Sequence, residues 1–306
     1  MKSCALFVLL VLASGCAPVT APTSGANSSG SKKTIVVTYS VLGAVVRDLA
    51  GDQANVVVPM PNGQDPHEWE PSAKDIETLN KADFIVQNGL GLEAGMGKTL
   101  AQARKSGVRF FTASDYIAVR KVGPDEGLPT GDPDQAAGAK DPHLWMDPLT
   151  IKLVVDALAV RLESDLGIAV ADRARDLDSR LDTLNQELAD QVRALPPANR
   201  RLVTGHESLG YFAQRYDFKL VGALIPNLSS QAQVSASELA ALKKQIQDNQ
   251  VKAIFVELGT PPAVASAISK ETGVKVVPLT THSLPSDGSY FTFMRNLARV
   301  VTDGLK

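Results

Sequence analysis

The chain has 306 residues, of which 44% are hydrophobic and 21% are charged, so it has enough apolar material for a core and too much for a disordered protein. Its 31 Lys and Arg nearly balance its 33 Asp and Glu, whereas nucleic-acid binding normally shows as a basic domain. Two cysteines exclude a disulfide scaffold and an all-cysteine zinc site. At about 100–200 residues per domain, the length favours two domains, with a single large domain as the alternative.

The amino terminus has the features of an export signal. Lys2 precedes an apolar run at residues 5–12 that is too short to span a membrane and typical of a signal peptide. Ala13-Ser14-Gly15-Cys16 follows and resembles a lipobox. We therefore expect residues 1–15 to be a lipoprotein signal peptide, Cys16 to carry the lipid, and the polar residues 16–33 to form a flexible tether. An ordinary secretory signal with an incidental Cys is the alternative.

After residue 33, short β-branched runs alternate with amphipathic helices, which is the pattern of a parallel α/β sheet. The first series of predicted strands covers residues 34–39, 54–60, 82–87 and 108–111. Its predicted helices cover residues 41–49, 75–81 and 92–105. Residues 121–140 bring Gly, Pro and Asp in quick succession and predict a long loop.

Helical periodicity returns at Pro148, and a long charged helix is predicted at residues 173–195, with leucines at 177, 181, 184 and 188 on one face. A second series follows, with strands at residues 201–204, 219–223, 253–256 and 274–278 and helices at residues 209–216, 235–248, 263–272 and 290–302. The predicted fold class is α/β, with two lobes that each contain a parallel sheet flanked by helices. The boundaries are residues 34–170 for the N-terminal lobe, 171–197 for one long linking helix, and 198–306 for the C-terminal lobe.

The chain has only four histidines: His67, His143, His206 and His282. The first two lie in near-copies of one motif, DPHEW at 65–69 and DPHLW at 141–145, which also contain both tryptophans. Each lobe holds two histidines near a predicted strand end or helix start, where α/β sheets bind ligands. A cleft between the lobes could therefore collect four imidazoles, common ligands for zinc. The alternative is that they are unrelated surface or core residues.

Known catalytic motifs do not fit the chain. His67-Glu68 and His206-Glu207 begin like H-E-x-x-H, but neither has the second His. The sequence also lacks a G-x-S-x-G nucleophile elbow and a phosphate loop. We therefore expect that the protein is not an enzyme.

Further motifs accompany the histidines over residues 34–306. They are Glu70-Pro71, Asn88-Gly89 with Leu92-Glu93, Met146-Asp147-Pro148, Gly205-His206-Glu207 with Gly210-Tyr211-Phe212, Phe255-Val256-Glu257 and Met294-Arg295-Asn296. With them the chain resembles the metal-binding lipoproteins of bacterial ABC importers for zinc, manganese or iron, solute-binding protein family 9. The resemblance implies two α/β lobes bridged by one rigid helix, with the metal in the cleft between them. It places metal ligands at His67, His143, His206 and the segment after the last strand.

The fourth ligand is where this chain departs from the family, which usually has Asp or Glu in the segment matched by residues 281–283. His282 stands there, and Asp287 is the nearest acidic alternative. Four imidazoles favour zinc, whereas manganese prefers oxygen ligands and copper would also tolerate imidazole. Because imidazolium must lose its proton to bind, we expect affinity to fall as pH drops through roughly 6.5.

Four glutamates near the motifs are candidates to accept hydrogen bonds from the imidazoles, or alternatively are surface or salt-bridge residues: Glu68, Glu70, Glu207 and Glu257. The loop at residues 123–140 is acidic and has no His.

The expected function is capture of one divalent metal ion, zinc first and manganese as the alternative, and delivery to an ABC permease and its ATPase. A filled shell of four histidines leaves no open position for a reactive water, which favours carriage over catalysis. A surface adhesin and a secreted metallohydrolase are weaker alternatives. We expect a monomer without a nucleic-acid partner, held by its lipid anchor outside the cytoplasm, at the cell surface or in the periplasm.

Overall fold

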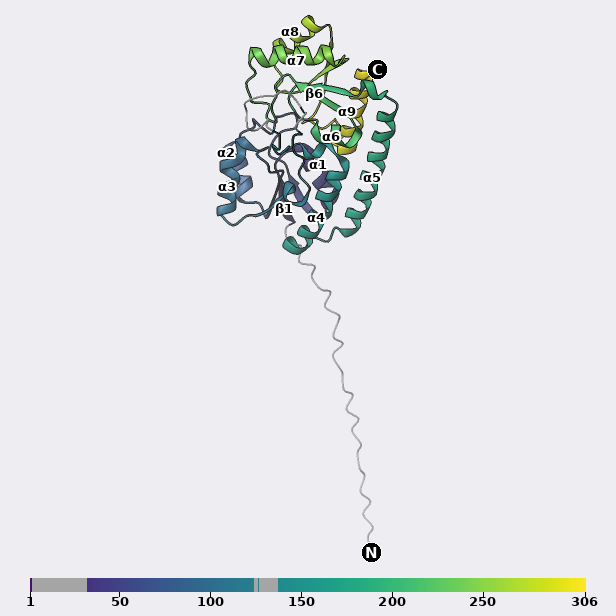
Figure 1. Ribbon diagram of the computed structural model, residues 1–306. Coiled ribbons are helices and arrows are strands. Elements are labelled where there is room, and N and C mark those ends of the chain that lie inside the picture. Colours follow the sequence, from purple (N-terminus) through teal and green to yellow (C-terminus); the bar gives the residue numbers. More distant parts are fainter. Residues whose placement is uncertain (2–31, 124–125, 127–136) are drawn as a thin grey trace. The chain divides into compact units, whose positions relative to one another are not determined.

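Two four-stranded parallel sheets form the framework of this computed structural model, which describes residues 1, 32–123, 126 and 137–306 (Figure 1). The first sheet has the order β2-β1-β3-β4 and the second the order β6-β5-β7-β8, with every pairing parallel. The strands are β1 Lys33–Val37, β2 Ala54–Val57, β3 Phe84–Gln87, β4 Arg109–Thr112, β5 Arg201–Thr204, β6 Lys219–Ala223, β7 Ala253–Val256 and β8 Lys275–Pro278. The two sheets therefore repeat one topology, and the predicted α/β class is confirmed.

Helices connect the strands, as parallel pairing requires. They are α1 Ser40–Ala50, α2 Ala73–Asn80, α3 Gly97–Lys105, α4 Pro148–Leu166, α5 Ala171–Arg193, α6 Gly210–Tyr216, α7 Ala236–Asp248, α8 Pro262–Thr272 and α9 Tyr290–Leu305. Within the described part of the chain, no helix combines the length and apolar character needed to cross a membrane. The predicted signal peptide, most of the tether with Cys16, and most of the acidic loop lie outside the described residues.

Local sequence explains where the helix α4 begins and ends. Pro148 occupies the first turn of α4, where its missing N–H costs nothing, and Asp147 caps the helix by accepting from Leu149 N at 3.0 Å. Gly167 ends α4 in the left-handed conformation, at φ 70°, which favours glycine. The chain then reverses into α5.

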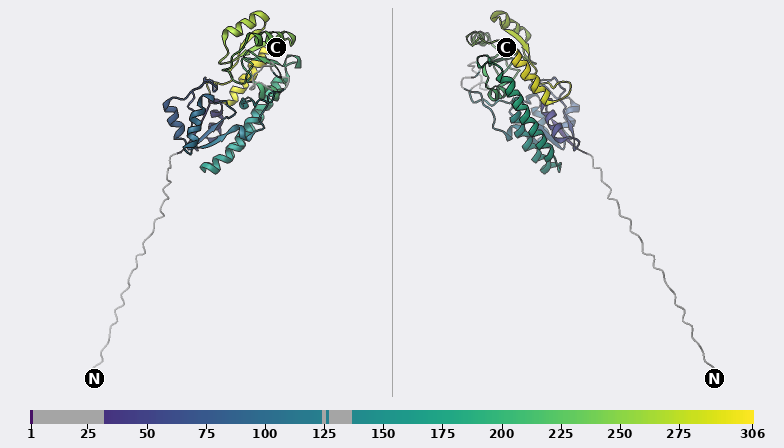
Figure 2. Two further views of the ribbon diagram at one scale, coloured as in Figure 1. Left: turned by 60° about the vertical axis from the view of Figure 1, so that its left-hand side comes forward. Right: turned by 90° about the vertical axis from the view of Figure 1, so that its right-hand side faces the viewer.

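The long helix α5 contacts both halves of the molecule. It packs along α4, touches α1 after the first strand, and runs beside α9 at the carboxyl terminus (Figure 2). Its leucines at 177, 181, 184 and 188 are buried in one apolar core that includes residues from both sheets. The helix α5 thus packs on a core shared by both sheets. The lobe boundaries expected from the sequence remain a prediction.

One predicted helix is shorter than expected. Residues 92–105 were expected to be helical throughout, but α3 begins at Gly97 and follows a 3₁₀ turn at Ala94–Met96. Glu93 explains the difference, because its buried carboxylate accepts hydrogen bonds from the backbone N of Asn88 at 2.6 Å and of Gly89 at 3.2 Å. These bonds fold residues 88–93 into a tight turn in place of a first helical turn.

Candidate metal centre

The structure brings the four histidines together. Their candidate ligand atoms all lie within 4.8 Å of one another, and all four side chains are buried. His67 follows β2, His143 precedes the 3₁₀ helix η4 (Leu144–Met146), His206 follows β5 and His282 follows β8. Each sheet thus contributes two imidazoles at the carboxyl ends of its strands or in the segment that follows them, where α/β proteins bind ligands.

Two nitrogen–nitrogen distances within the cluster fit the tetrahedral coordination of one metal ion. His143 Nε2 lies 3.3 Å from His67 Nε2 and 3.2 Å from His206 Nε2. Zinc–nitrogen bonds of about 2.0–2.1 Å place neighbouring nitrogens of a tetrahedron about 3.3 Å apart. The Nε2 atoms of His67, His143 and His206 therefore include two pairs at the spacing that one tetrahedrally coordinated zinc ion needs.

Asp141 fixes the orientation of His143. Its Oδ1 accepts hydrogen bonds from His143 Nδ1 and from His143 backbone N, both at 2.9 Å. A carboxylate accepts, so the ring proton lies on Nδ1 and the lone pair of Nε2 faces the cluster. Sequence reasoning missed this role of Asp141, although an Asp two residues before the His in both repeated motifs was the available signal.

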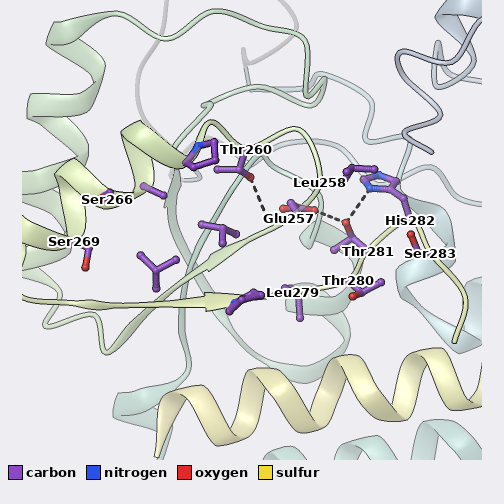
Figure 3. Close-up of a pocket in the computed structure, with 15 residues that line it drawn as sticks. Glu257, Leu258, Thr260, Ser266, Ser269, Leu279, Thr280, Thr281, His282 and Ser283 are labelled. Carbon is purple, nitrogen blue, oxygen red and sulfur yellow. Dashed lines mark hydrogen bonds between the residues drawn. The ribbon is translucent and has the colours of Figure 1, made fainter. Parts of the chain in front are cut away.

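Glu257 performs the corresponding task for His282 through a hydroxyl. Thr281 Oγ1 donates to Glu257 Oε2 at 2.6 Å, so the same oxygen accepts from His282 Nδ1 at 2.9 Å. Figure 3 shows these three side chains in a row, joined by dashed lines. The Nε2 atom of His282 is left with its lone pair, buried and without a hydrogen-bond partner. A buried imidazole nitrogen whose lone pair has no hydrogen-bond partner can coordinate a metal ion.

The same carboxylate lies near a second histidine. Glu257 Oε1 stands 3.5 Å from His206 Nδ1, and Ser208 Oγ lies 2.9 and 2.8 Å from the two carboxylate oxygens. Burial raises the pKa of Glu257 to about 6. Of the four glutamates considered from the sequence, Glu257 is therefore the one whose carboxylate approaches the histidines directly.

The other three glutamates are placed differently. Glu68 and Glu70 are exposed and take no part in the hydrogen bonds at the histidines. Glu207 is largely enclosed beside Asp141 and Arg120, and burial, with the nearby carboxylates, raises its pKa to about 7.

Burial also governs the protonation of the histidines. It lowers the pKa of His67 and of His282 to about 3, and it lowers the pKa of His206 well below its ordinary value. These rings are neutral at ordinary pH, so their lone pairs are available without loss of a proton. His67, His206 and His282 are therefore neutral nitrogen donors.

Asp287 lies outside this cluster. Its carboxylate is exposed and accepts from Ser289 N at 3.0 Å and from Thr292 Oγ1 at 2.7 Å, at the start of α9. The Asp287 carboxylate therefore stabilises the start of α9.

Two cavities border the histidine cluster. One of about 690 Å³ is lined by Glu257, Thr281 and His282 (Figure 3), and another of about 630 Å³ is lined by His67 and Pro142. His282 and His67 thus each line one of the two cavities.

Comparison with known proteins gives a consistent assignment. The family described as zinc-uptake complex component A, periplasmic, matches residues 35–304. A manganese ABC transporter substrate-binding lipoprotein, ScaA of Streptococcus gordonii, is 27% identical over 100% of this chain and 99% of its own. The zinc-binding lipoprotein AdcA of Streptococcus pneumoniae is 29% identical over 88% of this chain and 54% of its own.

A solved structure shows the same fold. The periplasmic zinc-binding protein TroA of Treponema pallidum superposes with a TM-score of 0.76 at 26% identity, over 90% of this chain and 99% of TroA. The resemblance inferred from the motifs is therefore confirmed, as is the prediction that the protein is not an enzyme. The chain belongs to the zinc-uptake complex component A family and is a substrate-binding protein of a metal ABC transporter.

Proposed function

We propose that the protein captures one zinc ion with His67, His143, His206 and His282 and delivers it to a membrane permease driven by an ATPase. The observation that carries the proposal is the all-nitrogen donor set, since the group found among the described residues contains four imidazoles and no carboxylate. Zinc accepts four nitrogen ligands readily, whereas manganese prefers carboxylate and water oxygen.

Manganese is the second candidate because relatives named for manganese are among the similar proteins. The two metals are separated by titrating the metal-free protein with zinc and with manganese in a calorimeter. We expect one zinc per chain and much weaker manganese binding. Equal or tighter binding of manganese would overturn the zinc assignment.

A matched variant sharpens this comparison. His206→Glu replaces one nitrogen donor by a carboxylate and should narrow the preference for zinc over manganese. Glu70→Gln, on the surface, should leave the preference unchanged.

We further propose that the protein works outside the cytoplasm, anchored by lipid on Cys16. The lipobox-like residues 13–16 support this, and relatives are named as lipoproteins or periplasmic proteins. A Cys16→Ala variant should be released or left unprocessed, and it should incorporate no labelled fatty acid. An unlipidated, soluble wild type would contradict the anchor.

A further inference from the structure

The two DPH motifs have the same sequence but different partners for their aspartates. Asp65 Oδ1 accepts from His67 N at 2.9 Å, and its Oδ2 accepts from Ser230 Oγ at 2.6 Å. Asp141 Oδ1 accepts from the backbone N and from Nδ1 of His143, and its Oδ2 accepts from Arg120 Nη1 at 3.0 Å. The Oδ2 atom of Asp65 therefore accepts from a neutral hydroxyl, whereas the Oδ2 atom of Asp141 accepts from a charged guanidinium.

Arg120 is held firmly in this position. Its side chain is 5% exposed, and the carboxylate of Asp141 is fully buried. Its backbone N donates to Tyr211 OH at 2.9 Å, and its carbonyl oxygen accepts from Asp141 N at 3.0 Å. The side chain also pairs with Glu126. Arg120 thus lies immediately behind the group that orients His143.

The helix α6 of the second sheet packs against this ion pair. A Cβ atom on Gly210, the first residue of α6, would lie 2.2 Å from Asp141 Oδ2 and 2.4 Å from Arg120 Nη1. Only glycine allows the helix to approach so closely. The pair is therefore buried beneath α6 and shielded from water, which strengthens its electrostatic interaction.

We infer that Arg120 is a positioning residue for metal capture, which acts on His143 through Asp141. Its guanidinium balances the buried charge of Asp141 and holds the carboxylate so that Oδ1 faces His143 Nδ1. The ring proton is thereby kept on Nδ1, and the Nε2 lone pair is kept toward the cluster. This inference rests on the proposed function, because it concerns the donor strength of one of the proposed ligands.

The direct test measures the tautomer of His143 in the metal-free protein by side-chain ¹⁵N NMR, together with zinc affinity. In Arg120→Met, His143 should no longer populate only the tautomer that carries its proton on Nδ1. Zinc binding should weaken by about 10–100-fold, the usual effect of removing a residue that hydrogen-bonds a metal ligand. Arg120→Lys, which keeps the charge, should restore part of both. A folded Arg120→Met with an unchanged tautomer and unchanged zinc affinity would overturn the inference.

Arg215→Met is a control, because Arg215 also forms an ion pair, with Asp147 at 2.7 Å, and neither side chain hydrogen-bonds to a histidine among the described residues. It should leave the tautomer of His143 and the zinc affinity unchanged. An equal loss in this control would show that Arg120 acts only through general stability, against the inference.

A second measurement does not depend on the stability of the single variant. On an Asp141→Asn background, Arg120→Met should change zinc affinity little, because its route to His143 is already removed. An undiminished effect there would contradict action through Asp141. A wild type that binds no divalent metal would end the proposed function, whereas the tautomer of His143 would still decide this inference.

Discussion

Trp145 donates its indole Nε1–H to the carbonyl oxygen of Thr281 at 2.9 Å, which ties the second DPH motif to the segment that carries His282. Asn62 adds two bonds to the same segment, donating to Leu284 O at 2.9 Å and accepting from Leu284 N at 2.8 Å. His282 follows the last strand of the second sheet, yet its segment is held by Asn62, which follows β2 of the first sheet, and by Trp145, which follows β4.

The relationship is reciprocal. Ser230 donates to Asp65, and Gln231 Nε2 donates to the carbonyl oxygen of His67 at 3.1 Å. Each half of the protein therefore secures a histidine of the other half, so the four-nitrogen geometry requires both.

Removing the tryptophan N–H should weaken this connection. Trp145→Phe keeps an aromatic ring but leaves the buried Thr281 carbonyl without its donor, at a cost of about 1–3 kcal/mol in the free energy of unfolding. Denaturant unfolding of the metal-free protein measures this. Trp69→Phe in the first motif is the control, since the Trp69 side chain makes no hydrogen bond within residues 32–123, 126 and 137–306. A loss in the control as large as in Trp145→Phe would contradict the role given to the hydrogen bond.

The assignment of the fourth ligand predicts an asymmetry between two nearby variants. His282→Ala should weaken zinc binding by more than the roughly 10–100-fold that loss of an outer partner costs, because it deletes a donor atom. Asp287→Ala should leave zinc affinity unchanged and lower stability slightly, since its carboxylate supports the start of α9. Calorimetric titration, with circular dichroism to establish folding, measures both. The reverse order of effects would make Asp287 the ligand.

Glu257 should matter for zinc although it is not a proposed ligand. Glu257→Gln removes the charge that receives the Thr281 hydroxyl and that faces His206, so zinc affinity should fall about 10–100-fold. Glu68→Gln, exposed beside His67 in the sequence, should have no effect. If the two variants bind zinc equally well, Glu257 does not support the imidazoles.

Burial changes the pH dependence expected from ordinary histidines. At pH 6, three histidines with a pKa of about 6.5 would be about three-quarters protonated and would release about two protons on binding zinc. The lowered pKa values of His67, His206 and His282 leave no such protons to release. The expected fall of affinity through pH 6.5 is therefore replaced by a shallower fall near pH 6, where Glu257 takes up a proton.

Calorimetry in buffers of different ionisation enthalpy counts these protons. We expect about one proton or fewer per zinc at pH 6. Glu257→Gln should reduce the number further. Release of two or more protons would mean that the imidazoles are protonated before zinc arrives.

Much of the fold could be predicted because local sequence and tertiary structure agree. The strands at residues 201–204, 219–223 and 253–256 have the bounds expected from their β-branched runs, and α4 begins at Pro148 as expected. The prediction failed at residues 92–96, where the side chain of Glu93 binds the backbone of a preceding segment. Such a side-chain bond leaves no periodic signal in the sequence.

The histidines could be grouped from their motifs, but their supporting groups could not. Glu68 and Glu70 are closest to His67 in sequence and are exposed, whereas Glu257, directly after β7, contacts the segment that follows the neighbouring strand β8. Arg120 contacts Asp141 at the base of a long loop, next to the β-bridge between Lys121 and Lys140. Contacts between distant segments decide these roles, and they depend on packing that one sequence does not display.

Whether four imidazoles bind one zinc ion can be seen in a crystal structure of the zinc-loaded protein with anomalous data at the zinc edge. We expect one zinc at the cluster, with the Nε2 atoms of His67, His143, His206 and His282 each at about 2.0–2.1 Å from the ion. A carboxylate oxygen of Asp287 at about 2.0–2.2 Å from the ion, with His282 turned away, would contradict it.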